Sequence, residues 1–278
     1  MWTMENRGRY DRSKQRYPSD LTDAEWKLVE PLIPPGKRGG GRRKVIVREV
    51  VNGLMYVLST GCQWAAIPKD LPPKSTVYDY FDLWSWDHTL DAIHEALYVK
   101  CREQASRETS PTAAIIDSQS VKSAEKGGLT IRRGTTQARR SRARSATFSS
   151  IRKACMMHAI VHAADIQDRD GGALVMATLF GMFPFLLKLY ADGGYQGPIF
   201  RRALKKIASC VNVEIVKRSD TVKKFVVLPK RWVVERTFAW LGRCRRLARD
   251  WENFNQKALA FLRLASIRLM LRKLCNPA

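Results

Sequence analysis

The stretches Ala113-Ala114-Ile115-Ile116-Asp117 and Phe185-Leu186-Leu187-Lys188-Leu189-Tyr190-Ala191-Asp192 decide the fold of this chain. Each is a short, mostly apolar run that ends in an aspartate, which predicts a buried strand followed by a carboxylate. In α/β sheets, catalytic groups gather at the carboxyl ends of the strands. A carboxylate in such surroundings is costly unless it is paired or binds a metal. We therefore predict that Asp117 and Asp192 lie at one edge of a sheet.

A third acid, Glu235, lies in a run that predicts one long helix from Pro229 to about Glu252. Residues spaced by three or four share one side of a helix. On that side we expect Arg231, Glu235, Phe238, Gly242, Arg245 and Arg249. Arginines beside a carboxylate are suited to bidentate contacts with phosphates. The alternative is a solvated basic face.

Three such carboxylates match the hard oxygen ligands that Mg²⁺ prefers, and Mn²⁺ is the alternative ion. Two metal ions about 3.5–4 Å apart activate the attacking oxygen and stabilise the leaving oxygen in phosphodiester transfer. We predict Asp117, Asp192 and Glu235 as both the catalytic and the metal-binding residues. Any one of these acids, taken alone, could equally cap a helix or form a salt bridge.

Alternating strands and helices surround the three acids. We predict further strands over 158–164 and 211–216, and helices over 173–183, 198–208 and 257–274. This alternation favours an α/β layer fold over residues 111–278.

Residues 21–110 predict an all-helical, helix-turn-helix-like domain. Thr22 and Glu25 form a capping-box pattern for a first helix, and helices follow over 45–60, from Lys74, and over 90–107. At the start of the third helix, Lys74, Ser75 and Thr76 are candidate DNA contacts. The alternative is a helical bundle whose aromatic residues form core.

Two further segments of the N-terminal part are polar. Residues 1–20 predict a flexible N-terminus. The glycine-rich hinge over 36–44 carries Arg42, Arg43 and Lys44, which are either phosphate contacts or part of a solvated loop.

The charge of the chain points to a polyanionic partner. It has 49 Lys and Arg against 26 Asp and Glu, for a net charge of +23. Nucleic acid is the most common partner of such a basic protein. Six scattered cysteines, no membrane-length apolar run and a polar N-terminus predict a soluble cytoplasmic, nucleoid-associated protein.

Three motifs together resemble the DDE transposases of the bacterial insertion-sequence-five family, within the insertion-sequence-four-like superfamily. They are IIDSQSVK (115–122), YADGGYQG (190–197) and RWVVERT (231–237). The resemblance implies a ribonuclease-H-like catalytic domain, a divalent metal, and recognition of terminal inverted repeats in double-stranded DNA. It also implies target DNA as second substrate and assembly on DNA as a homodimer or larger complex, and Lys122 joins the candidate DNA contacts.

Residues 129–155 depart from the family pattern. The run LTIRRGTTQARRSRARSATFSSIRKAC has no acid and no strand or helix periodicity. Residues 137–155 can be written as a series of codons that, when translated from the third base, encodes GKKIKGKKRHILVDTQGL. This shifted peptide contains the turn and the strand that the family pattern has at this place. We hypothesise two compensating frame changes, with a weakened strand beside Asp117 and impaired activity as the consequence.

The leading hypothesis is a metal-dependent DNA transposase. The second is a DNA-binding remnant that does not catalyse. A ribosomal or RNA-associated protein comes third, and it would not require Asp192 and Glu235.

Overall fold

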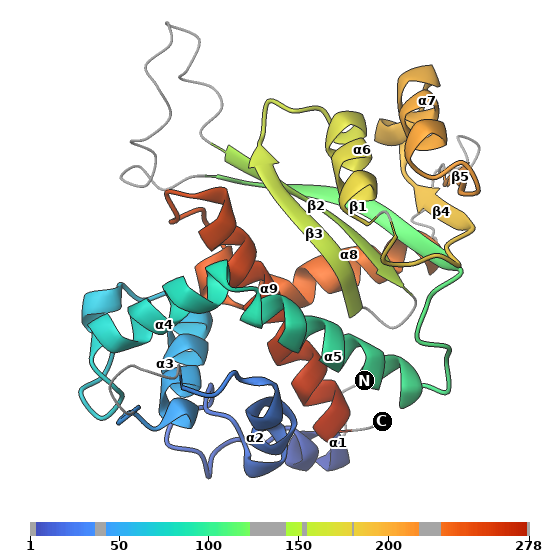
Figure 1. Cartoon of the computed structure of the whole chain (residues 1–278). Helices are drawn as coiled ribbons and strands as arrows, with labels where there is room; N and C mark the ends of the chain where they lie inside the picture. Colours follow the sequence, from blue (N-terminus) through green and yellow to red (C-terminus); the bar gives the residue numbers. More distant parts are fainter. Residues whose placement is uncertain are drawn as a thin grey trace, which may run out of the picture.

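The computed structural model describes residues 4–36, 43–122, 143–151, 155–179, 181–216 and 229–276 (Figure 1). The N-terminal part is helical, with α1 (Met4–Arg9), α2 (Asp23–Val29), α3 (Val47–Thr60), α4 (Lys74–Trp86) and α5 (Thr89–Glu103). The rest contains β1 (Ala113–Lys122), β2 (Ala143–Ile151), β3 (Cys155–Ala163), α6 (Asp168–Thr178), β4 (Lys188–Ala191), α7 (Pro198–Ile207), β5 (Asn212–Ile215), α8 (Pro229–Leu241) and α9 (Asn255–Cys275). Short 3-10 turns lie at Glu30–Leu32, Trp64–Ala66, Gly193–Tyr195 and Arg245–Leu247.

The helix boundaries of the N-terminal part follow local signals. The Thr22 hydroxyl accepts the backbone N–H of Glu25 at 3.2 Å, and the Glu25 carboxylate accepts that of Thr22 at 3.0 Å, so the predicted capping box is present. Helix α3 ends at Gly61, whose φ of 68° is the left-handed conformation that glycine adopts without strain. In α4, Phe81 and Trp84 are buried, so these aromatic residues form core.

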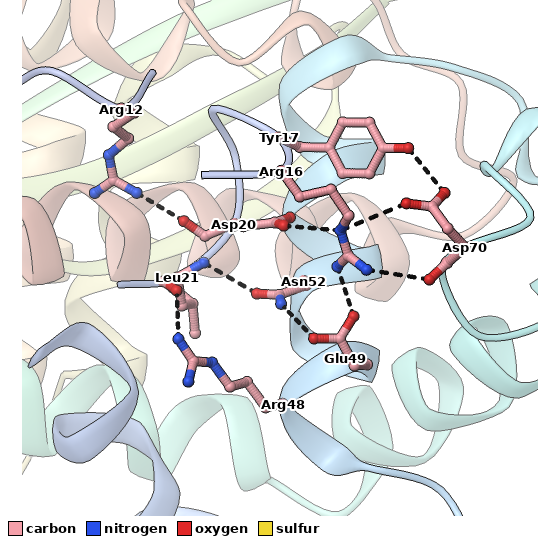
Figure 2. A network of polar contacts seen from close by, with 9 residues as sticks. All are labelled: Arg12, Arg16, Tyr17, Asp20, Leu21, Arg48, Glu49, Asn52 and Asp70. Carbon is pink, nitrogen blue, oxygen red and sulfur yellow. Dashed lines mark hydrogen bonds and ion pairs between the residues drawn. The ribbon is translucent and has the colours of Figure 1, made fainter. Parts of the chain in front are cut away.

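The segment before α2 is held by ion pairs. The Arg16 guanidinium donates to the carboxylates of Asp20 (3.2 Å) and Glu49 (2.5 Å) and to the backbone carbonyl of Asp70 (3.1 Å) (Figure 2). These partners come from its own segment, from α3 and from the loop before α4. The prediction of a flexible segment over 1–20 did not include these contacts, which join Arg16 to residues distant in sequence.

The five strands form one sheet in the order β3-β2-β1-β4-β5. Strands β1, β4 and β5 are parallel to one another, whereas β2 runs antiparallel to both of its neighbours. Strand β2 comes from the part of the chain that departs from the family pattern, and its pairing with β3 contains a register shift between Ser149 and Ser150. The remaining residues of that segment, 129–142 and 152–154, lie outside the described residues.

Helices cover both faces of the sheet. Helix α6 lies on one face with α7 beside it, and α5, α8 and α9 lie on the other (Figure 1). The last helix, α9, packs against both β3 and the N-terminal helices, and its Phe261 ring lies 4.4 Å from the ring of Phe81 in α4. One hydrophobic core therefore joins the helical part to the sheet. Within the described part of the chain, no helix has the length and apolar character that crossing a membrane requires.

Helix α6 begins at Asp168, five residues before the predicted start at Ala173. The two preceding glycines made a helix there unfavourable from sequence alone, since glycine costs about 0.5–1 kcal/mol in a helix interior. A Cβ atom added at Gly172 would lie 2.6 Å from the ring of Tyr195. The glycine allows the helix to approach this ring closely, and the resulting packing offsets its conformational cost.

Candidate active site

Asp117 and Asp192 occupy equivalent positions beside two parallel strands. The last pair in the β1–β4 ladder joins Ile115 to Tyr190, and each aspartate lies two residues further along its strand. Asp192 follows the end of β4, as predicted. Asp117 does not end its strand, because β1 continues to Lys122 along its antiparallel neighbour β2. The prediction that the strand ends at Asp117 is therefore wrong, because β1 continues beside β2 up to Lys122. The parallel pairing of β1 with β4 does end before Asp117, at Ile115.

Backbone amides hold one oxygen of each aspartate. The Oδ1 atom of Asp117 accepts the N–H of Ser118 at 2.8 Å. The Oδ1 atom of Asp192 accepts the N–H of Gly194 at 2.9 Å and so begins the turn at Gly193–Tyr195. Both side chains are half-buried. These contacts fix the side-chain rotamers of two carboxylates at the same edge of the sheet.

A further acid, Asp168, lies at this edge and was missed in the sequence. It is the first residue of α6, and the Ser118 hydroxyl donates a hydrogen bond to its Oδ1 atom. The nearby Tyr195 is buried, and its pKa is raised by that burial and by the charges of Asp117, Asp168 and Asp192. The only sequence signal was an acidic residue beyond the predicted strand, which by itself predicts no site.

Glu235 lies on α8, which packs against β1 and β2, and its side chain is exposed. This helix ends at Leu241, where Gly242 N–H still donates to the carbonyl of Phe238 (2.8 Å) and a turn follows. The prediction of one helix that reaches Glu252 is therefore wrong. Arg245 and Arg249 lie beyond the end of α8, so they do not share a helix face with Glu235, contrary to the prediction.

The turn after α8 has a tertiary cause. A Cβ atom at Gly61 would lie 3.1 Å from the backbone of Arg245, so the chain passes directly over the end of α3. A continued helix would not follow that path. Arg245 and Arg249 are both exposed on this irregular segment.

The acids do not form a preassembled metal shell. Among the residues that the structure describes, no three His, Cys, Asp or Glu side chains are grouped so that they could hold a metal ion. The oxygen-rich donor set nevertheless matches the chemistry of Mg²⁺ or Mn²⁺.

The candidate DNA contacts of the helical part are mostly accessible. Lys44, Lys74 and Ser75 are exposed, and Thr76 is half-buried. Arg43 is half-buried, donates to the backbone carbonyl of Pro34 at 3.1 Å and lies over the ring of Tyr80. Lys122 is exposed at the end of β1. Arg42 and the side chain of Arg231 lie outside the described residues.

A cationic cavity of about 930 Å³ lies between α8 and α9 and reaches α5 and β3. Five basic residues and no acidic residue line it within the described chain: Arg236, Arg243, Arg268, Arg272 and Lys273. Burial, together with the charge of Arg268, lowers the pKa of Arg272 to about 10. The sequence places these residues on two separate helices, so only the packing of α8 against α9 reveals the cavity.

The sheet, its flanking helices and its edge carboxylates define a mixed α/β domain preceded by an all-helical region. Residues 108–270 match the family model described as "Transposase DDE domain", and residues 21–94 match "Putative transposase of IS4/5 family (DUF4096)". The first match covers more than half of the chain, so the protein belongs to the DDE transposase family of the IS4/IS5 type.

One curated relative supports this assignment. The "Insertion element IS402 uncharacterized 16.2 kDa protein" of Burkholderia cepacia is 32% identical over 113 residues. The match covers 38% of this chain and 76% of that protein. No solved structure matches the chain. DDE transposase domains generally use divalent metal ions.

Proposed function

We propose that this protein binds the terminal inverted repeats of its element and catalyses metal-dependent cleavage and joining of DNA strands. The catalytic acids of this proposal are Asp117, Asp192 and Glu235. The observation that carries it is the β1–β4 register, which brings Asp117 and Asp192 to the same level just beyond the parallel ladder. Glu235 approaches from α8, which packs on β1.

The sheet supports a ribonuclease-H-like fold for residues 111–278. Such a sheet needs its second strand beside the first, and β2 pairs with β1 along eight residues from Ile115 to Lys122. The helical region over 21–110 is then the DNA-binding domain of the proposal. The exposed cations at the start of α4 and the net charge of +23 support DNA as its partner, bound by a homodimer or larger assembly.

In the proposed mechanism the chain supplies oxygen ligands and phosphate contacts. A bound divalent ion supplies activation of the attacking oxygen and stabilisation of the leaving oxygen. The N–H groups of Ser118 and Gly194 orient the carboxylates of Asp117 and Asp192. Exposed arginines and lysines hold the DNA backbone. Water would be the attacking group in cleavage and a DNA 3′-hydroxyl in joining, so no protein nucleophile is required.

The test is an assay of strand cleavage and transfer with inverted-repeat DNA and Mg²⁺ or Mn²⁺. Asp117→Asn, Asp192→Asn and Glu235→Gln should each reduce the rate by more than about 100-fold, because even the outer partners of a metal site contribute about 10- to 100-fold. Asp165→Asn, at an exposed aspartate outside the proposed triad, is the matched control and should leave the rate unchanged. Full activity in any of the three variants would contradict the assignment of that residue.

The second candidate function is DNA binding without catalysis. It is favoured by the absence of a grouped metal shell among the described residues and by the origin of β2 in a segment without the family pattern. Binding of inverted-repeat DNA without cleavage would support this candidate. The hypothesis of two compensating frame changes is tested by the gene itself, since codons that do not yield the family peptide when shifted would exclude it.

A further inference from the structure

Three elements bring Asp168 to the edge of the sheet where Asp117 and Asp192 lie. Ser118, the neighbour of Asp117 in β1, donates its hydroxyl to Oδ1 of Asp168 at 2.5 Å. A Cβ atom at Gly194 would lie 3.1 Å from Oδ1 of Asp192 and 3.2 Å from Oδ2 of Asp168. The carboxylates of Asp168 and Asp192 therefore both lie beside Gly194, close to the position that a Cβ atom there would take.

The Tyr195 hydroxyl is an independent sign that this place accepts a ligand. The residue is only 1% exposed, and its hydroxyl has no hydrogen-bond partner among the described residues. A buried hydroxyl without a partner destabilises the folded state, so a ligand or a rearranged carboxylate that accepts from it would be favoured. Its ring packs against Gly172 of α6, and its backbone N–H donates to the carbonyl of Asp192 at 3.3 Å, so the residue lies between α6 and the turn that follows β4.

Two carboxylates of the cluster, Asp168 and Asp192, also form no ion pair with a lysine or an arginine within the described part of the chain, although the protein carries 49 of them. Neighbouring carboxylates destabilise one another in the absence of a cation. Oxygen ligands of this kind select a hard divalent cation.

We propose that Asp168 is a fourth carboxylate of the divalent-metal site, beside Asp117 and Asp192, and that Tyr195 is a positioning residue that donates a hydrogen bond to one of these carboxylates when the ion is bound. This inference rests on the proposed function and deepens it. It adds Asp168, at the start of α6, to the proposed metal-binding residues Asp117, Asp192 and Glu235, none of which lies on that helix.

The simpler role for Asp168 is to stabilise the start of its helix, since acidic residues favour the positive end of the helix dipole. Asp170 is the matched control because it lies in the same first turn, carries the same charge and is exposed. A helix-dipole role predicts equal effects of Asp168→Asn and Asp170→Asn. A metal-ligand role predicts an effect of Asp168→Asn alone.

The experiment titrates the full-length protein with Mn²⁺ and measures free Mn²⁺ by electron paramagnetic resonance. Asp168→Asn should raise the dissociation constant at least about tenfold, and Asp170→Asn should change it less than twofold. Tyr195→Phe should raise it to an intermediate value while thermal unfolding without metal stays unchanged. Wild-type affinity in Asp168→Asn would overturn the proposal.

Thermal unfolding separates this role from a structural one. Without metal, Asp168→Asn should melt at or above the wild-type temperature, because it removes charge repulsion and keeps an oxygen that accepts from Ser118. With Mn²⁺ it should lose the stabilisation that the wild type gains. A melting temperature well below wild type without metal would overturn the proposal in favour of a structural role.

The same titration distinguishes this inference from the proposed function. If Asp117→Asn and Asp192→Asn weaken Mn²⁺ binding and Asp168→Asn does not, only the role of Asp168 is refuted. If all three variants bind Mn²⁺ like the wild type, the proposed metal site itself is refuted.

Discussion

Substitution of Gly172 by alanine tests whether the close approach of α6 to Tyr195 organises the candidate site. The added Cβ atom would lie 2.6 Å and 2.8 Å from two ring carbons of Tyr195 and 3.0 Å from a ring carbon of Phe200. Carbon atoms in optimal contact are about 3.5–4.0 Å apart. Both rings are 1% exposed, so neither has space to move aside. The helix itself would therefore have to move away by about 1 Å to restore an optimal carbon–carbon contact distance.

The magnitude follows from two opposing contributions. Overpacking of a well-packed core costs about 1–3 kcal/mol. Alanine is favoured over glycine inside a helix by about 0.5–1 kcal/mol, which offsets part of that cost. We expect a net loss of about 1–2 kcal/mol, which corresponds to a decrease in Tm of about 2–6 °C for a protein of this size.

The assay is thermal and urea unfolding of Gly172→Ala in two backgrounds. In the wild-type background the substitution should destabilise the protein. In a Tyr195→Leu background the two closest contacts are removed and the 3.0 Å contact with Phe200 remains, so the destabilisation should be clearly smaller. A stabilising effect in the wild-type background, or the same effect in both backgrounds, would refute the packing argument. Mn²⁺ affinity should fall together with stability, because α6 carries Asp168 at its start.

Three further predictions concern the core and its ionisable groups. Asn52→Leu should lower the free energy of unfolding by about 1–3 kcal/mol in a urea titration, because the Asn52 amide accepts a backbone N–H at 3.0 Å inside the core; an unchanged midpoint would contradict this. Alkylation of Cys155 by iodoacetamide should have its midpoint at a lower pH than that of a free thiol, since a hydrogen bond from the buried Cys101 thiol and the charge of Lys273 lower its pKa. Lys273→Met should move that midpoint to higher pH, and no movement would argue against the role of the lysine. Stability should fall as the pH decreases from about 6.5 towards 4, because burial lowers the pKa of His94 to about 3 and that of His158 to about 4, so that the unfolded chain binds more protons. The slope should approach about 1.4 kcal/mol per pH unit for each histidine, and a flat profile in denaturant titrations would refute the assignment.

Local signals in the sequence were enough to predict several elements. Thr22 and Glu25 form the predicted capping box, because both partners lie within one helical turn. Helix α4 begins at Lys74, directly after two prolines that cannot continue a preceding helix. Of the run 185–192 that predicted a strand, residues 188–191 form β4, and Asp192 follows its end. Each of these features depends on residues close together in the chain.

Other features depend on contacts that the sequence does not show. Helix α8 stops at Leu241 because the chain must cross the end of α3 at Gly61, which is about 180 residues earlier in the sequence. Arg16 pairs with Glu49 and Asp70 from two other segments, and the polar sequence around Arg16 gives no sign of these contacts. Asp168 carries no strand-end signal, and only the folding of α6 against Tyr195 places it beside the candidate site.

The sequence by itself determined the family, the basic charge, most of the helices and the strand that Asp192 follows, since these are written in motifs, composition and short-range periodicity. Only the tertiary structure decided which acids lie together, where α8 ends and how one core joins the helical part to the sheet. The physical reason is that side-chain packing between distant segments selects among conformations that local propensity alone leaves nearly equal in free energy.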